Sequence, residues 1–293
     1  MTARTEYTLI NPSTKALAFS LFTYEEGSVF ESVKSYGYYS MILVLEGEGT
    51  FQSDVSEFEF ASESLICFSL YQSFSLKPKG GMRGVLIHFH PDFFCIHKHQ
   101  EEVACNGVLF NNPYETPLVR LDKESVSSLL LLVDSIQAEM QNAAVAQYEL
   151  LVSYLKIFLI QASRIKMQER GTVVQAESGR EPFILKTLKD AIEEHFRTKH
   201  SPGEYADLLN ITTKALNRLS KMHFKKTLTG LIAERIMVEA KRELYLTVKS
   251  VKIIAYELGF NDEFYFSRFF KNQASVSPQV YRETVGFGKG SGL

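Results

Sequence analysis

Two segments in the last third of the 293-residue chain repeat one another. The first covers residues 206–221 (ADLLNITTKALNRLSK) and the second covers residues 255–271 (AYELGFNDEFYFSRFFK). Their first halves align at an offset of 49 and their second halves at an offset of 50, so the second copy has one extra residue in its middle. A repeat of this kind means that one supersecondary unit occurs twice, and the fold of this region must hold both copies.

Each copy has the sequence pattern of a helix-turn-helix. A short helix carries a small residue, Ala206 or Ala255, against which a second helix can pack closely. Asn210 and Gly259 follow where the turn needs a left-handed residue, and these residue types tolerate that conformation. A polar N-cap then begins the second helix. The candidate caps are Thr212 or Thr213 in the first copy and Asn261 or Asp262 in the second.

The residues around the repeat predict further helices. Ser201-Pro202-Gly203-Glu204 is a capping box with proline at the first helical position, and Ser277-Pro278 begins a last short helix in the same way. Residues 227–245 are expected to form one connecting helix, about 28 Å long at 1.5 Å per residue. A rod of this length can hold two recognition helices about one DNA turn apart, ~34 Å.

The region of residues 183–284 resembles the DNA-binding domain of AraC/XylS-type regulators. The resemblance is carried by residues 254–262 (IAYELGFND), 265–271 (YFSRFFK) and 277–282 (SPQVYR), and Arg235 and Ala240 fit it on the connecting helix. Two features depart from the family pattern. Phe264 stands where the family usually has a small polar residue, and the usual glycine after the first recognition helix is missing.

The resemblance implies double-stranded DNA and RNA polymerase as partners. It favours an activator, although the residues themselves leave the sign of regulation and the operator open. The alternative for any single position is a solvated charge on a helix face. The base-contacting positions implied by the resemblance are Lys214, Asn217 and Arg218 in the first copy and Glu263, Phe264 and Arg268 in the second. The expected phosphate contacts are Thr213, Lys221, Lys225, Lys226 and Lys271.

The charge of the chain is unevenly distributed. Residues 1–180 hold 14 Lys and Arg against 21 Asp and Glu, a balance of -7. Residues 181–293 hold 18 against 13, a balance of +5. Opposite signs in the two halves indicate that the C-terminal half is the one that meets a polyanion.

The first ~90 residues predict short strands separated by Gly- or Ser-containing turns. Residues 45–49 (LEGEG), between two of these strands, resemble the cupin-like sensor domain common in the same family. The predicted fold class is therefore α+β: a cupin-like β-barrel with trailing helices, followed by an all-α domain of two helix-turn-helix units joined by a linker helix. We expect an effector-binding and dimerisation domain over residues 1–170, a linker over 171–180 and the DNA-binding domain over 181–293. The expected strands are 16–24, 38–45, 49–53, 64–68 and 84–90.

A small-molecule effector is expected inside the barrel, which can hold one small ligand. Tyr38, Phe51, Phe68 and His88 are its candidate lining, with ordinary core residues as the alternative. No metal and no cofactor are expected, because the histidines and glutamate of metal-binding cupins are absent. A metal-binding barrel stays open as an alternative, since one short segment contains His88, His90, Cys95, His97 and His99.

Helices are expected over residues 125–141 and 146–168. The second has an apolar stripe that must be buried. We predict that it pairs two protomers in a homodimer, although packing on its own barrel is the alternative. The residues of this predicted dimer helix are Tyr148, Leu151, Leu155 and Phe158.

The remaining features exclude other classes of protein. We find no nucleophile–base pattern and no Gly-rich phosphate loop, so an enzyme is not expected. The N-terminus has no apolar core typical of a signal peptide, no apolar run reaches the ~18 residues of a membrane span, and three cysteines fit a reducing compartment. A cytoplasmic protein is therefore expected. A further alternative is a regulator whose N-terminal half only dimerises or binds a protein partner.

Overall fold

The computed structural model describes residues 6–11, 15–25, 30–54, 56–97, 99–103, 107–142, 144–177 and 183–285. The chain divides into two compact units, which we call the N-terminal unit and the C-terminal unit. The main division falls between Val173 and Val174, within a long helix, and the short segments Asp54–Glu57 and Pro113–Thr116 group with the C-terminal unit.

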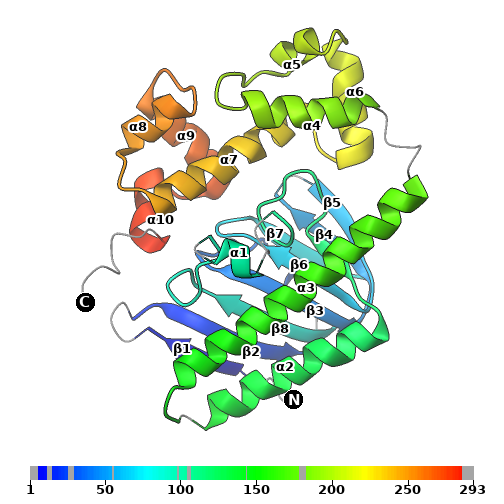
Figure 1. Cartoon of the computed structure of the whole chain (residues 1–293), viewed down its shortest axis with the longest axis vertical. Helices are drawn as coiled ribbons and strands as arrows, with labels where there is room; N and C mark the ends of the chain where they lie inside the picture. Colours follow the sequence, from blue (N-terminus) through cyan, green and yellow to red (C-terminus); the bar gives the residue numbers. More distant parts are fainter. Residues whose placement is uncertain are drawn as a thin grey trace. The chain divides into compact units, whose positions relative to one another are not determined.

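The N-terminal unit is built on two antiparallel sheets (Figure 1). The larger sheet has the order β1 (Glu6–Ile10), β2 (Leu17–Tyr24), β8 (Arg83–Phe89), β3 (Tyr39–Glu46), β6 (Ser64–Phe68) and β9 (Leu118–Arg120). The smaller sheet has the order β5 (Ser56–Phe60), β4 (Gly49–Ser53) and β7 (Phe74–Pro78). One apolar core takes side chains from both sheets, including Phe22, Ile42 and Leu86 from the larger and Phe51 and Leu76 from the smaller.

The central strands of the larger sheet are buried on both faces. Ile42 and Leu86, which are register partners, point into the core between the sheets, so Met41 and Ile87 point to the other face, and these are also buried. Two helices, α2 (Lys123–Gln141) and α3 (Gln147–Glu177), lie side by side along this sheet (Figure 1). A hydrogen bond of 3.1 Å from Ser128 Oγ to Gln161 Oε1 joins them.

The α+β fold class predicted from the sequence is confirmed. All five predicted strands are present within one residue of their expected ends, whereas β1, β5, β7 and β9 are missing from the prediction. Helix α3 continues to Glu177 instead of ending near residue 168, so the predicted linker at 171–180 begins as helix. Residues 178–180 of that linker lie outside the described residues.

In the C-terminal unit, the described residues from Phe183 onward form helices joined by turns and short loops. Its helices are α4 (Phe183–His195), α5 (Pro202–Leu208), α6 (Thr213–Phe224), α7 (Leu228–Leu246), α8 (Val251–Glu257), α9 (Glu263–Ala274) and α10 (Pro278–Val285). The short α1 (Gln100–Val103) belongs to the N-terminal unit. Within the part of the chain that the structure describes, no helix combines the length and apolarity that a bilayer crossing requires.

Candidate nucleic-acid interface

The sequence repeat corresponds to two helix-turn-helix motifs, the first formed by α5 and α6 and the second by α8 and α9. Their turns have the same hydrogen bond: Ile211 N donates to Ala206 O at 3.0 Å, and Phe260 N donates to Ala255 O at 2.9 Å. The residue before each donor is left-handed, with φ of 52° at Asn210 and 79° at Gly259. The turn residues predicted from the sequence are therefore confirmed.

The structure also decides which residue caps each second helix. Thr212 Oγ1 accepts a hydrogen bond from Ala215 N at 3.3 Å. Asp262 accepts from the N–H groups of Phe264 and Tyr265 at 3.1 and 3.0 Å. These bonds satisfy backbone donors that the first turn of a helix leaves free, so both second helices begin at a fixed point.

Each second helix presents one exposed row of side chains opposite its buried face. In α6 the row consists of Lys214, Arg218, Lys221 and Lys225, and in α9 it consists of Phe264, Arg268, Lys271 and Ser275; all eight are exposed. We call these rows the first and second reading stripes. The first three members of each row are spaced i, i+4 and i+7, which places them on one helical face. Lys225 and Ser275 follow as the left-handed residues that end the two helices. The buried face consists of Leu216, Ser220 and Phe224 in α6 and of Phe266, Phe270 and Ala274 in α9.

Each reading stripe contains an exposed arginine followed by an exposed lysine. Among the described residues, neither Arg218 nor Arg268 forms an ion pair, and each guanidinium is exposed. An arginine in this state can donate two hydrogen bonds to O6 and N7 of guanine in the major groove. Lys221 and Lys271 lie one turn further along, where an ammonium group suits a phosphate.

Two residues expected to touch DNA have partners inside the C-terminal unit instead. Asn217 is half-buried, and its Oδ1 accepts a hydrogen bond of 3.0 Å from Leu228 N at the start of α7. Lys226 Nζ forms an ion pair of 2.5 Å with Glu234 Oε2 on α7. Thr213 and Glu263 occupy matched first positions of α6 and α9, outside the reading stripes.

Helix α7 connects the two motifs and carries a buried carboxylate. Glu239 is 4% exposed and accepts hydrogen bonds from Arg197 at 2.7 Å, Arg242 at 2.9 Å and Arg235 at 3.4 Å. The Arg235 guanidinium also lies over the Phe196 ring, 3.9 Å from its centroid. Since leaving a buried charge without its partners is costly, this cluster ties the chain before α5 firmly to α7.

The same segment contacts the turn of the second motif. A Cβ placed on Gly259 would lie 2.1 Å from the carbonyl oxygen of Arg197, so the two backbones touch there. The ring of His200 lies 4.8 Å from the ring of Phe260. Residues 196–200, which we call the brace, therefore bind both the connecting helix and the second motif, and so fix the spacing between the motifs.

The residues predicted to line an effector pocket separate into two groups. Phe51 and Phe68 are both 1% exposed and belong to the apolar core, where Phe68 stacks on Phe74 at 4.0 Å. These two are ordinary core residues. Tyr38 and His88 lie together, with ring centroids 4.6 Å apart, and half-buried Tyr36 completes the cluster at 5.3 Å from His88. Tyr36 was absent from the prediction because nothing in the sequence distinguishes it from its neighbouring tyrosines.

His88 is buried, and its imidazole ring lacks a hydrogen-bond partner at one of its two nitrogens among the described residues. Burial lowers its pKa to about 3, and a hydrogen bond with the backbone of Tyr39 offsets this only in part. The imidazole is therefore neutral at neutral pH. Its Nδ1 has no hydrogen-bond partner among the described residues, and an unsatisfied buried nitrogen calls for an explanation.

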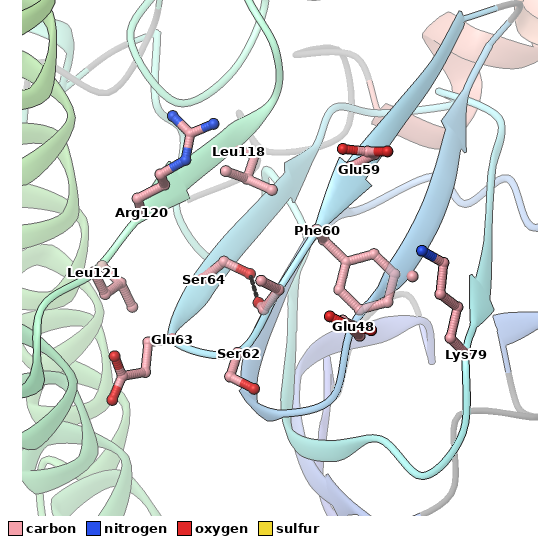
Figure 2. Close-up of a pocket in the computed structure, with 12 residues that line it drawn as sticks. Glu48, Glu59, Phe60, Ser62, Glu63, Ser64, Lys79, Leu118, Arg120 and Leu121 are labelled. Atoms are coloured by element: carbon pink, nitrogen blue, oxygen red, sulfur yellow. Dashed lines mark hydrogen bonds between the residues drawn. The ribbon is translucent and has the colours of Figure 1, made fainter.

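A surface pocket of about 380 Å³ opens elsewhere on the N-terminal unit, between β5, β6 and β9 (Figure 2). Glu59, Glu63, Lys79 and Arg120 give it both signs of charge, and none of the predicted effector residues lines it. The Arg120 guanidinium is bound to Glu169 at 2.9 Å. The pocket therefore offers no concentrated charge to select a ligand.

The histidine-rich segment does not form a metal site in the described residues, where no group of three His, Cys, Asp or Glu side chains could hold an ion. His90 Nδ1 accepts a hydrogen bond from Asp92 N at 3.1 Å. His99 hydrogen-bonds Glu102 at 2.8 Å and stacks on Phe94.

The structure corrects the choice of residues for the predicted dimer, because the apolar stripe of α3 is buried within one protomer. Leu151, Leu155 and Phe158 are 0% exposed within one protomer, so their burial needs no second copy of the chain. Tyr148 is partly exposed, but its hydroxyl donates to the carbonyl oxygen of Phe93 at 2.9 Å. The apolar side chains that α2 and α3 expose are different ones: Leu131, Leu150, Ile157 and Met167.

Comparison with known proteins identifies the C-terminal region. A family profile described as "Helix-turn-helix domain" matches residues 205–284. The region is therefore a helix-turn-helix domain, as the sequence repeat predicts.

Relatives with assigned functions match over part of their length. The chain is 27% identical over 165 residues to the HTH-type transcriptional activator RhaS of Enterobacter sp., covering 55% of this chain and 54% of that protein. It is 30% identical over 95 residues to the raffinose operon transcriptional regulatory protein RafR of Pediococcus pentosaceus, covering 32% of this chain and 34% of that protein. The chain thus spans about half or less of the curated relatives it matches.

Among solved structures, the chain is similar to ToxT of Vibrio cholerae, with 14% identity, a TM-score of 0.40 and coverage of 92% of this chain and 98% of that one. It is also similar to the C-terminal domain of AraT from Geobacillus stearothermophilus, with 26% identity, a TM-score of 0.36 and coverage of 39% and 94%. Likenesses of this degree carry no weight for function.

Proposed function

We propose that this protein is a sequence-specific DNA-binding transcription regulator whose C-terminal unit reads two successive major-groove segments of double-stranded DNA. The observation that supports this most strongly is the pair of reading stripes, which are exposed, matched in position and held at a fixed spacing by the brace and α7. In helix-turn-helix proteins the second helix enters the major groove, and its exposed side chains reach the base edges.

The proposed roles follow the geometry. Asn217 and Lys226 already have partners within the unit, so we assign them to its structure and not to DNA. The residues proposed to contact DNA phosphates, and so to position the protein, are Thr213, Lys221, Lys225 and Lys271. The proposed base-reading residues are Lys214, Arg218, Glu263, Phe264 and Arg268.

The test is selection of duplexes bound by the full-length chain from a random pool. We expect a bipartite sequence whose halves lie about one helical turn apart, 10–10.5 base pairs. A fragment of residues 181–293 is expected to bind the same duplex, with an affinity that falls as salt rises because counterions are released. Failure of the full chain to enrich any sequence contradicts the proposal.

A small-molecule effector is part of the same proposal. The cluster of Tyr36, Tyr38 and His88 supports it, because it offers aromatic faces and one free buried nitrogen. The neutral imidazole suits a neutral ligand that can form a hydrogen bond. The similarity to RhaS, a transcriptional activator, favours an activator. Such a protein would contact RNA polymerase and act in the cytoplasm as a regulator and not as an enzyme.

A second candidate role for the N-terminal unit is dimerisation or protein binding without a ligand. It is favoured by the core between the sheets, which Phe51, Phe68 and Phe74 fill. A panel of small metabolites added to the full chain separates the two roles. A ligand that raises the melting temperature of the wild type and not of His88→Phe supports the effector.

A homodimer through α3, the helix that lies beside α2, is proposed on the exposed side chains Leu150 and Ile157 of α3. Sedimentation of the wild type and of a Leu150→Glu, Ile157→Glu variant tests it, with Val33→Glu, an exposed position on neither helix, as the control. We expect the double variant alone to sediment as a monomer. A wild type that is monomeric at high concentration contradicts the dimer.

A further inference from the structure

The most exposed aromatic side chain of the second motif is Phe264. It lies in the first turn of α9 and is 77% exposed, whereas Phe266 and Phe270 on the same helix are fully buried. Within the described residues its ring stacks on no other ring. Burial stabilises an apolar phenylalanine side chain, so this residue forgoes a stabilisation that its neighbours obtain.

Its neighbour Tyr265 is also exposed, but differs from it in two respects. Tyr265 is 57% exposed, and its ring lies 5.8 Å from that of Phe260, so it packs partly against the motif. It also carries a hydroxyl that water can bind. Phe264 has neither such a ring contact nor a hydroxyl, although the Asp262 cap fixes the backbone from which it projects. The fold holds an apolar ring outward in a defined position.

The position of this ring is that of a base-reading side chain. Phe264 is the first member of the second reading stripe, one turn before Arg268, and its counterpart in the first stripe is Lys214. A phenyl ring cannot donate or accept a conventional hydrogen bond, so it cannot read the polar edge of a base. In the major groove the apolar group available on a base pair is the C5 methyl of thymine.

We infer that Phe264 is a specificity-determining residue that contacts a thymine C5 methyl group in the half-site read by the second motif. This inference rests on the proposed function and adds to it the kind of base recognised. Arg268 is four residues after Phe264 on the helix, a rise of about 6 Å, close to the span of two base steps. The thymine therefore lies within about two base pairs of the guanine that Arg268 reads.

The experiment removes the methyl group from the DNA and the ring from the protein. Each thymine of the selected duplex is replaced in turn by deoxyuridine, which lacks only the methyl, and the affinity of the full-length chain is measured. We expect one position in the second half-site to lose about fourfold, the equivalent of the ~0.8 kcal/mol typical of one buried methyl-sized group. In Phe264→Ala the same replacement should have no effect.

The matched control is Lys214→Ala, which alters the equivalent position of the first motif. It should weaken binding but retain the fourfold preference for thymine in the second half-site. Phe264→Ala is expected to fold, because the ring it removes is exposed, and an unchanged melting temperature verifies this. A wild type that tolerates deoxyuridine at every position, or a thymine preference that persists in Phe264→Ala, overturns the inference and leaves the proposed function standing. Loss of all sequence-specific binding by the wild type overturns both.

Discussion

The two helix-turn-helix motifs share one backbone design but present different surfaces. Both turns have a left-handed residue, and both second helices begin at a polar cap and end in a left-handed residue, Lys225 with φ of 57° and Ser275 with φ of 61°. The second turn is one residue longer than the first. Of the four positions in each reading stripe, two keep their chemistry: arginine at 218 and 268, and lysine at 221 and 271. The other two change, from Lys214 to Phe264 and from Lys225 to Ser275 in the same order.

The difference shows which parts of the motif the fold constrains and which it leaves free. The buried faces stay mainly apolar in both, with Ser220 as the one polar member, because each must pack against its own first helix. The stripes are free to diverge, and they do so by charge: four cations in the first and two in the second. Under the proposed function, the first motif has more cations that can bind phosphates of the DNA backbone. The second motif has an apolar group that suits a base and not a phosphate.

The largest expected effect tests whether the matched turns are interchangeable. Exchanging the turn residues gives Gly259→Asn and Asn210→Gly. Asparagine tolerates a positive φ, but at 259 its Cβ would lie 2.1 Å from the Arg197 carbonyl oxygen. Overpacking of this kind costs roughly 1–3 kcal/mol, and the displaced brace adds to it. The reverse change at Asn210 should cost less than about 1 kcal/mol.

Hydrogen exchange of the full chain, followed by mass spectrometry, measures both changes locally. Peptides covering α8 and α9 should lose protection in Gly259→Asn, and peptides covering α5 and α6 should keep it in Asn210→Gly. Equal and small effects at the two positions would mean that the brace does not hold the second motif.

The difference between the two turn positions separates what could be predicted from the sequence from what could not. The turn positions Asn210 and Gly259 follow from the repeat, because left-handed residues are restricted to a few types. The contact between Gly259 and Arg197 does not, since it joins residues 62 positions apart in the chain. The same holds for Asn217: its exposure was expected from its place in the motif, whereas its bond to Leu228 depends on how α6 meets α7.

The second prediction compares the two arginines at matched positions of the repeat. Arg218→Ala and Arg268→Ala should each weaken specific binding by ~1–3 kcal/mol, because each removes a pair of hydrogen bonds to one guanine. The losses should map to separate base positions, one in each half-site. Repeating the duplex selection with each variant measures this. Relaxed preference at the same base in both variants contradicts the view that each motif reads its own half-site.

The third prediction sharpens the difference in charge between the stripes. Removing one lysine that neutralises a phosphate should reduce the slope of log affinity against log salt by about 0.9, because one fewer counterion is released. A Lys221→Ala, Lys225→Ala variant should therefore reduce the slope by about 1.8, and Lys271→Ala by about 0.9. Titrations at several salt concentrations give the slopes. Sequence preference should stay unchanged in both variants, since phosphates carry no base information.

The N-terminal unit shows the same boundary between what a sequence reveals and what it does not. Strands β4 and β6 were found with their ends correct, because turn residues bound their aromatic or β-branched runs. Strand β5 was missed, although Phe58 and Phe60 are buried and alternate with exposed Glu57 and Glu59. The apolar stripe of α3 was recognised, but its target could not be: a stripe must be buried, and its period does not say whether a partner or its own sheet buries it.

The smallest expected effect concerns Asn217, where the two motifs differ in an inward-facing position. Asn217→Ala removes the acceptor for Leu228 N and should lower the free energy of unfolding by ~1 kcal/mol, the typical net worth of one hydrogen bond. Asn217→Asp keeps an acceptor and should retain most of that stability. Ser267, the matched residue of α9, has no such bond in the described residues, so Ser267→Ala should change little. Urea unfolding, followed by hydrogen exchange at α6 and α7, gives the free energy of unfolding of all three variants. If Asn217→Ala instead leaves stability unchanged and alters the selected base sequence, Asn217 reads DNA, and the first motif recognises bases with one more side chain than proposed.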